Sequence, residues 1–80
     1  MTRRFHIGDK VQSVFRSRWH GIVVDEDYVK SIDGKLNHPI CVVKPLLTVD
    51  GRPQRKARLR SLSEAWLRPS TRPMELPKRP

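Results

Sequence analysis

A basic stretch between residues 52 and 60 carries the most concentrated chemistry in this chain. It holds five cationic side chains and no acidic one: Arg52, Arg55, Lys56, Arg58 and Arg60. Guanidinium and ammonium groups bind phosphate oxygens. An extended backbone would place alternate side chains about 7 Å apart on one face, near the phosphate spacing of a nucleic-acid strand. We predict a phosphate-binding row here. The alternative is a solvated edge strand that its charges protect from aggregation.

A second candidate is the segment Arg16-Ser17-Arg18-Trp19-His20. Two arginines beside an indole suit a site that grips a phosphate and stacks on a base. Trp19 also has a structural alternative, because a small β-domain needs a large apolar side chain over its open end. We therefore predict Arg16 and Arg18 as phosphate-binding residues, and Trp19 as either a stacking platform or such a lid.

Other reactive side chains do not converge on a site. Asp25-Glu26-Asp27 is the only acidic cluster, and consecutive strand residues point to opposite faces, so a solvated face or pairing with the basic stretch is expected there. Three histidines 14 and 18 residues apart, with one cysteine, match no zinc spacing. Cys41 lies in an apolar run, which favours a buried, unreactive thiol. No nucleophile–base arrangement can be assembled, so we expect no enzyme, metal or cofactor.

Strand patterns position these candidates. Residues 10–15 and 21–29 read as strands on either side of the loop 16–20, the second one strongly bent or bulged. Residues 40–49 form an apolar, β-branched run, in which Pro45 indicates a bulge or an edge position. Residues 55–62 alternate with a period of two, with Lys56, Arg58 and Arg60 on one face. Residues 63–65 fit one 3₁₀ turn and residues 66–68 a last short strand.

Two Asp-Gly pairs predict tight turns between strands. Asp33-Gly34 and Asp50-Gly51 each suit a two-residue type I′ hairpin turn, in which both residues have positive φ. Beyond the last strand, four of the twelve residues 69–80 are proline, which predicts a disordered or polyproline-II basic tail. The expected organisation is therefore one domain over residues 4–68 and a tail over residues 69–80.

Composition limits the size of the core and indicates the charge of a binding partner. The chain has 80 residues, 36% of them hydrophobic, so it can bury only a modest core. Seventeen basic residues against eight acidic ones give a formal charge of +9, which favours polyanionic partners. The longest apolar run has four residues, too few to span a membrane. With one cysteine, no intrachain disulfide can form, which fits a cytoplasmic location.

The expected element order resembles the SH3-like small barrel: an all-β fold of about five antiparallel strands with one 3₁₀ turn. Most of the likeness lies in Phe5-His6-Ile7-Gly8-Asp9-Lys10-Val11, followed by Trp19-His20-Gly21-Ile22-Val23-Val24. This pattern is similar to the Gly-Asp-x-Val … Gly-x-Val opening of KOW-type modules in ribosomal proteins and transcription elongation factors. The resemblance implies a barrel over residues 5–68 with Gly8 and Gly21 at tight turns.

Two functions follow as expectations. The first is a non-enzymatic module that binds nucleic acid, with RNA preferred over DNA, or a nucleoprotein complex. Its site would comprise the phosphate-binding residues of the basic stretch and of the loop 16–20. The second is a protein-interaction or assembly module, such as a small adaptor, a subunit or a viral accessory protein, with an acidic protein partner. The same barrel hosts both classes, so fold alone does not choose between them.

Overall fold

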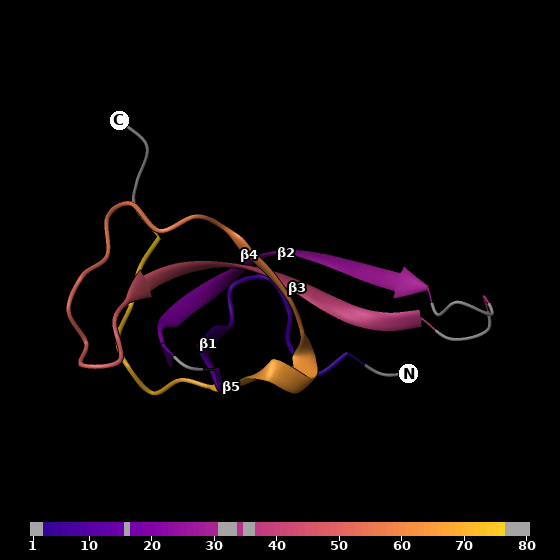
Figure 1. Ribbon diagram of the computed structural model, residues 1–80, viewed down its shortest axis with the longest axis horizontal. Helices are drawn as coiled ribbons and strands as arrows, with labels where there is room; N and C mark the ends of the chain where they lie inside the picture. The colour runs from indigo at the N-terminus through magenta and orange to yellow at the C-terminus, as the bar shows by residue number, and fades with distance from the viewer. Residues whose placement is uncertain (1–2, 16, 31–33, 35–36, 77–80) are drawn as a thin grey trace.

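The computed structural model describes residues 3–15, 17–30, 34 and 37–76, and these build an all-β domain (Figure 1). In chain order the elements are β1 (Lys10–Ser13), β2 (His20–Lys30), β3 (Asn37–Leu47), β4 (Arg60–Ser63), the 3₁₀ turn η1 (Glu64–Trp66) and β5 (Leu67–Pro69). No α-helix occurs among the described residues, so none there could cross a membrane.

The five strands form one antiparallel sheet in the order β4-β3-β2-β1-β5. The strands β4 and β5 occupy its two edges and are joined directly by η1. Over the described residues the two edges are not hydrogen-bonded to each other, so the sheet is open where the sequence predicted a barrel. Figure 1 shows β2 and β3 running the length of the molecule and projecting beyond the other strands.

Two bulges bend the long β2–β3 ribbon. The register shifts between Val23 and Asp25, which makes Val24 an extra residue and confirms the predicted irregularity of this strand. A second shift sets His20 opposite Leu47 and Gly21 opposite Pro45, which makes Leu46 an extra residue and places a bulge directly after Pro45. Pro45 is nevertheless not on an edge strand, because β3 lies between β2 and β4.

The core lies on the inner face of this bent sheet. Val11, Val23, Cys41 and Val43 are fully buried there, and Phe5, Trp19 and Leu67 complete the cluster. Burial of the Cys41 thiol, as expected from its apolar run, raises its pKa. Trp19 is 7% exposed, which matches the lid role.

The predicted strand over residues 55–62 is wrong for its first half. Only residues 60–63 are a strand, and they pair with β3 from Val43 to Ile40. In that register Arg58 would face Pro45, which has no N–H to donate. The Leu46 carbonyl instead accepts the Gln54 N–H, and Leu47 lies opposite Pro53 in an isolated bridge of a different register. The chain between the two pairings therefore loops out of the sheet.

The turn at Asp50-Gly51 also differs from the prediction. The Gly51 N–H donates to the Thr48 carbonyl, and the Thr48 N–H donates to the Arg52 carbonyl. Gly51 has a φ of +85°, whereas Arg18 is the only described non-glycine residue with a positive φ, so Asp50 has a negative one. This is a three-residue hairpin loop closed by a glycine bulge, not a type I′ turn. At the other pair, Gly34 has a φ of +72° and Lys30 pairs with Asn37, while Asp33 lies outside the described residues.

Residues 69–76, the described part of the expected tail, contact the sheet. Pro69 ends β5, and the Ser70 N–H donates to the Lys10 carbonyl. Met74 is buried, and the Arg72 guanidinium lies beside Gly51. Figure 1 shows this yellow segment running next to the β3–β4 connection. The disordered tail is therefore not seen over these residues, and residues 77–80 lie outside the described part.

Candidate nucleic-acid interface

The β3–β4 connection carries the basic stretch on an irregular, exposed backbone. Arg52 follows the Gly51 turn, Arg55 to Arg58 lie in the looped-out segment, and Arg60 opens β4. All five basic side chains of this stretch are exposed. They do not form one straight row with strand spacing, because the segment before Arg60 is not extended in the sheet. The structure thus presents a basic loop, which we call the basic connection (residues 52–60).

The loop between β1 and β2 carries the other predicted site residues, Arg16, Arg18 and Trp19. Arg16 lies outside the described residues. Arg18 is exposed and has a φ of +42°, a left-handed conformation that non-glycine residues rarely adopt. Its N–H donates to the Phe15 carbonyl and its own carbonyl accepts from the Gln12 amide. These contacts hold the loop in place, and Trp19, which is 7% exposed, borders the pocket between this loop and β4.

A pocket opens where this loop meets β4. It has a volume of about 420 Å³ and is lined by Ser13, Phe15, Ser17, Trp19, Arg60 and Leu62. Arg60 pairs with Val43 and Leu62 with Cys41 in the sheet register. Both pairing partners are core residues, so these two side chains lie on the inner face at the open end of the sheet. Arg60 is both the first residue of β4 and the last residue of the basic connection. The pocket therefore lies between the open end of the core and the basic connection.

An exposed aromatic pair borders the same pocket. The rings of Phe15 and Trp66 lie 4.4 Å apart between centroids at an interplanar angle of 45°, and the side chains are 47% and 45% exposed. The Val14 N–H donates to the Trp66 carbonyl, which fixes the end of β1 against η1. The sequence predicted both residues in strands, over residues 10–15 and 66–68, whereas in the structure Phe15 follows β1 and Trp66 ends η1. The sequence feature that could have marked Phe15 as a binding residue is its position directly before Arg16-Ser17-Arg18.

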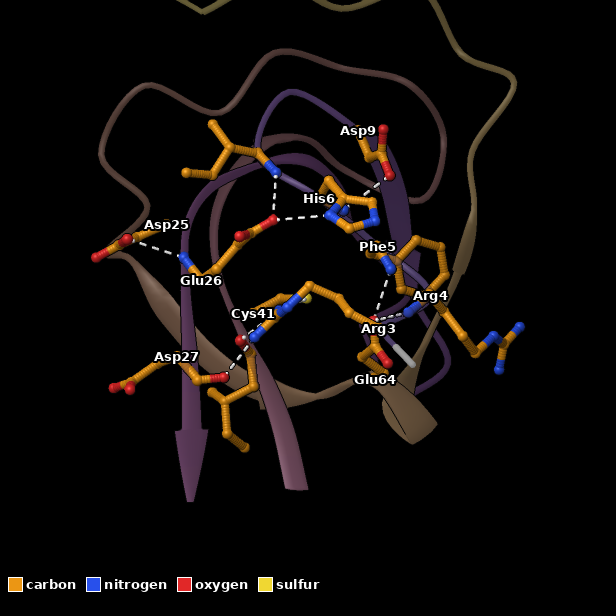
Figure 2. Close-up of polar contacts among 12 residues, drawn as sticks. Arg3, Arg4, Phe5, His6, Asp9, Asp25, Glu26, Asp27, Cys41 and Glu64 are labelled. Atoms are coloured by element: carbon orange, nitrogen blue, oxygen red, sulfur yellow. Dashed lines mark hydrogen bonds and ion pairs between the residues drawn. The ribbon is translucent and has the colours of Figure 1, made fainter. Parts of the chain in front are cut away.

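Three carboxylates, those of Glu64, Glu26 and Asp9, are engaged at another place, around the N-terminal segment (Figure 2). Glu64 accepts the backbone N–H groups of Arg4 and Phe5, each at 2.6 Å. Glu26 contacts the His6 ring at 3.1 Å and accepts the Ile7 N–H. Asp9 accepts the His6 N–H. These carboxylates hold the segment over the inner face of the sheet.

Arg3 is anchored in the same region without a carboxylate contact. Its guanidinium donates to the carbonyls of Ile40 (3.0 Å) and Asp27 (2.5 Å), and it lies 4.7 Å from the centroid of the Tyr28 ring. Arg3 is 8% exposed, so its cation belongs to the folded interior. The sequence analysis did not identify this residue, because nothing in the pair Arg3-Arg4 indicates that the first arginine is buried and the second exposed.

The acidic cluster behaves as a solvated face. Asp25 and Asp27 are exposed, and each carboxylate accepts the backbone N–H of the next residue, while Glu26 contacts His6. Within the described part of the chain, no group of three or more His, Cys, Asp or Glu side chains could hold a metal ion. The predicted alternative, pairing with the basic stretch, is not seen between described residues, where the His6–Glu26 contact is the only ion pair. The described cations of the basic connection thus have no carboxylate within 4.0 Å.

A polar network occupies the outer face of β1, β2 and β5. His20 is 6% exposed, and its Nδ1 lies 2.7 Å from the Ser70 hydroxyl. The Arg68 guanidinium donates to the Gln12 side chain at 2.9 Å. Burial, together with the nearby Arg72 and Arg68 cations, lowers the pKa of His20. The described contacts of His20 include no carboxylate, so this network fastens the segment after β5 and assembles no catalytic triad.

No protein-family model, no curated protein and no solved structure matches this chain.

Proposed function

We propose that this protein is a non-enzymatic module that binds nucleic acid, RNA in preference to DNA, or a nucleoprotein complex, through the basic connection and Arg18. The observation that carries the proposal is a set of exposed cations without described carboxylate partners, the last of which, Arg60, lines a pocket together with Phe15 of the exposed aromatic pair. Phosphate groups supply the missing counter-charge, and bases supply flat surfaces for the rings.

The strand order adds support from architecture. An SH3-like barrel pairs its first strand with both the second and the last, and a 3₁₀ turn joins its last two strands. The order β4-β3-β2-β1-β5, with η1 between β4 and β5, is compatible with that plan. We propose this fold family and its KOW-like branch as the setting for the interface. A cytoplasmic location belongs to the same proposal and rests on the single buried thiol of Cys41.

Salt dependence tests the electrostatic part of the proposal. Each phosphate neutralised on a single strand contributes a slope of about −0.7 to the plot of log K against log salt. Five contacts therefore predict a slope of about −3.5. Replacing Arg55, Lys56 and Arg58 together with alanine should flatten it by about 2 units.

A charge-matched control separates local binding from net charge. Arg4, Lys10 and Lys30 are also exposed and lie outside the basic connection. Their combined replacement with alanine lowers the net charge equally and should leave the slope near that of the unmodified protein. If both triple variants flatten the slope equally, the basic connection is not the interface. If the unmodified protein binds no nucleic acid at low salt, the proposal fails, and an acidic protein partner becomes the better explanation.

A further inference from the structure

We infer that the pocket beside the basic connection receives an unpaired nucleobase, so that the ligand is a single strand and not a duplex. This inference rests on the proposed function and adds the class of nucleic acid. It starts from the lining of the pocket, which combines the apolar surfaces of Phe15, Trp19 and Leu62 with the cation of Arg60.

The chemistry of the lining matches a nucleotide better than a phosphate alone. An anion needs only cations and N–H donors, and three apolar walls would add nothing to its binding. A nucleotide has a flat, largely apolar face for those walls and a phosphate for Arg60. The volume of about 420 Å³ also lies within the range of about 300 to 1,000 Å³ typical of small-molecule sites.

The aromatic pair extends this surface beyond the pocket. Phe15 lines the pocket and also packs against Trp66, with the two rings tilted by 45°, so the Phe15 ring is in contact with a second exposed ring. Only five aromatic side chains occur in the chain, and Phe5 and Trp19 are in the core. Two of the remaining three thus lie together at the pocket. This arrangement offers successive stacking positions, as in proteins that bind single strands with little sequence preference.

Duplex nucleic acid does not suit this surface. Its bases are stacked within the helix and are unavailable to a pocket unless one is extruded, at a cost of a few kcal/mol. A duplex could contact only the cations, and Phe15 and Trp66 would remain exposed. The two kinds of ligand are therefore distinguished by whether the aromatic residues contribute to affinity.

The experiment compares three probes by fluorescence anisotropy at low salt; the two single-stranded probes carry the same number of phosphates, and the duplex carries twice as many. They are a labelled single strand of about ten nucleotides, its abasic counterpart with the same phosphates, and the corresponding duplex. The proteins are the unmodified chain, Phe15→Leu, Trp66→Leu and the control Tyr28→Leu. Tyr28 is 49% exposed, similar to the two test residues, and lies on the projecting β2–β3 ribbon. Thermal unfolding by circular dichroism checks that each variant is folded.

The inference predicts tightest binding to the single strand. Loss of one stacked base should weaken binding by about 5- to 100-fold for Phe15→Leu or Trp66→Leu. Those variants should bind the abasic probe as the unmodified protein does, and Tyr28→Leu should bind all probes normally. Equal affinity for the single strand and its abasic counterpart, unchanged in the aromatic variants, with the duplex bound at least as tightly, would overturn the inference and leave the electrostatic interface intact. Absence of binding to every probe would overturn the proposed function with it.

Discussion

Glu64 is the residue whose replacement best tests how the N-terminal segment is held in the fold. It lies in η1, is 5% exposed, and accepts two backbone N–H groups of residues 4 and 5 (Figure 2). These two bonds fasten the segment that carries the core residue Phe5. Glu64→Gln keeps the shape of the side chain and removes its charge, so it isolates the contribution of the carboxylate.

The expected loss follows from the two hydrogen bonds. A bond to a charged acceptor contributes about 1.5 to 3 kcal/mol and a neutral one about 0.5 to 1.5, so the difference is about 1 to 1.5 kcal/mol per bond. Glu64→Gln should therefore lower the free energy of unfolding by about 2 to 3 kcal/mol. For a domain of this size, that corresponds to a fall in Tm of roughly 10 to 20 °C. Glu64→Ala should lose at least as much, because both N–H groups lose their partner.

Urea unfolding followed by circular dichroism measures this loss, and hydrogen exchange at Arg4 and Phe5 locates it. Glu75→Gln is the matched control, since Glu75 is exposed and is at the other end of the described chain. The control should unfold within about 0.5 kcal/mol of the unmodified protein. If Glu64→Gln matches the control in both stability and amide protection, the reasoning about this carboxylate is refuted.

Three further changes test other parts of the fold. Gly21→Ala should cost about 1 to 3 kcal/mol in urea unfolding, because the new Cβ would meet the Lys44 carbonyl oxygen and lie 2.9 Å from Val43 Cγ1; a neutral effect would contradict this close approach. Since the folded pKa of His20 is lowered, the unfolded chain binds more protons below about pH 6.5, and stability should fall on acidification from there. His20→Gln should reduce this pH dependence in urea titrations near pH 7 and pH 5, and an unchanged dependence would exclude His20 as its source. Arg18→Gly should relieve the positive φ and raise stability by up to about 1 kcal/mol while weakening nucleic-acid binding; a loss of stability would count against backbone strain there.

Local sequence patterns account well for β1, β2 and β3. Alternating or continuous apolar residues mark these strands, and Val11, Val23 and Val43 are buried where the patterns place them. The bulge next to Pro45 was predicted because proline cannot donate to a ladder. The 3₁₀ turn was displaced by one residue, to Glu64–Trp66, and its N-cap Ser63 accepts the Ala65 N–H at 3.3 Å.

The basic stretch shows where local patterns fail. Its period of two is real in the sequence, but a strand also needs a partner in register. β3 pairs with residues 60–63 in one register and with Pro53 in another. The residues between these two pairings therefore leave the sheet, although their side chains alternate as in a strand. The predicted disorder after β5 is not seen for a similar reason. The prolines of this segment exclude regular structure, but Ser70 contacts His20 and Met74 is buried, and composition does not reveal such long-range contacts.

For the candidate site, too, some features were predictable from the sequence and others were not. The exposure of the five cations of the basic connection was predictable from their charge. The pocket was not, because it depends on β4 meeting the end of β1, two segments about 50 residues apart in a chain of 80. The pairing of Phe15 with Trp66 depends on the same long-range arrangement.

An amide titration by NMR tests the nucleic-acid interface most directly. The ¹⁵N-labelled full chain is titrated with a short single-stranded RNA at low and at raised salt, and then with duplex DNA. The account predicts shifts at residues 13–15, 17–19, 52–62 and 66 that weaken as salt is raised, and larger shifts with the single strand. An absence of shifts at low salt, or shifts confined to the projecting β2–β3 ribbon, would contradict it.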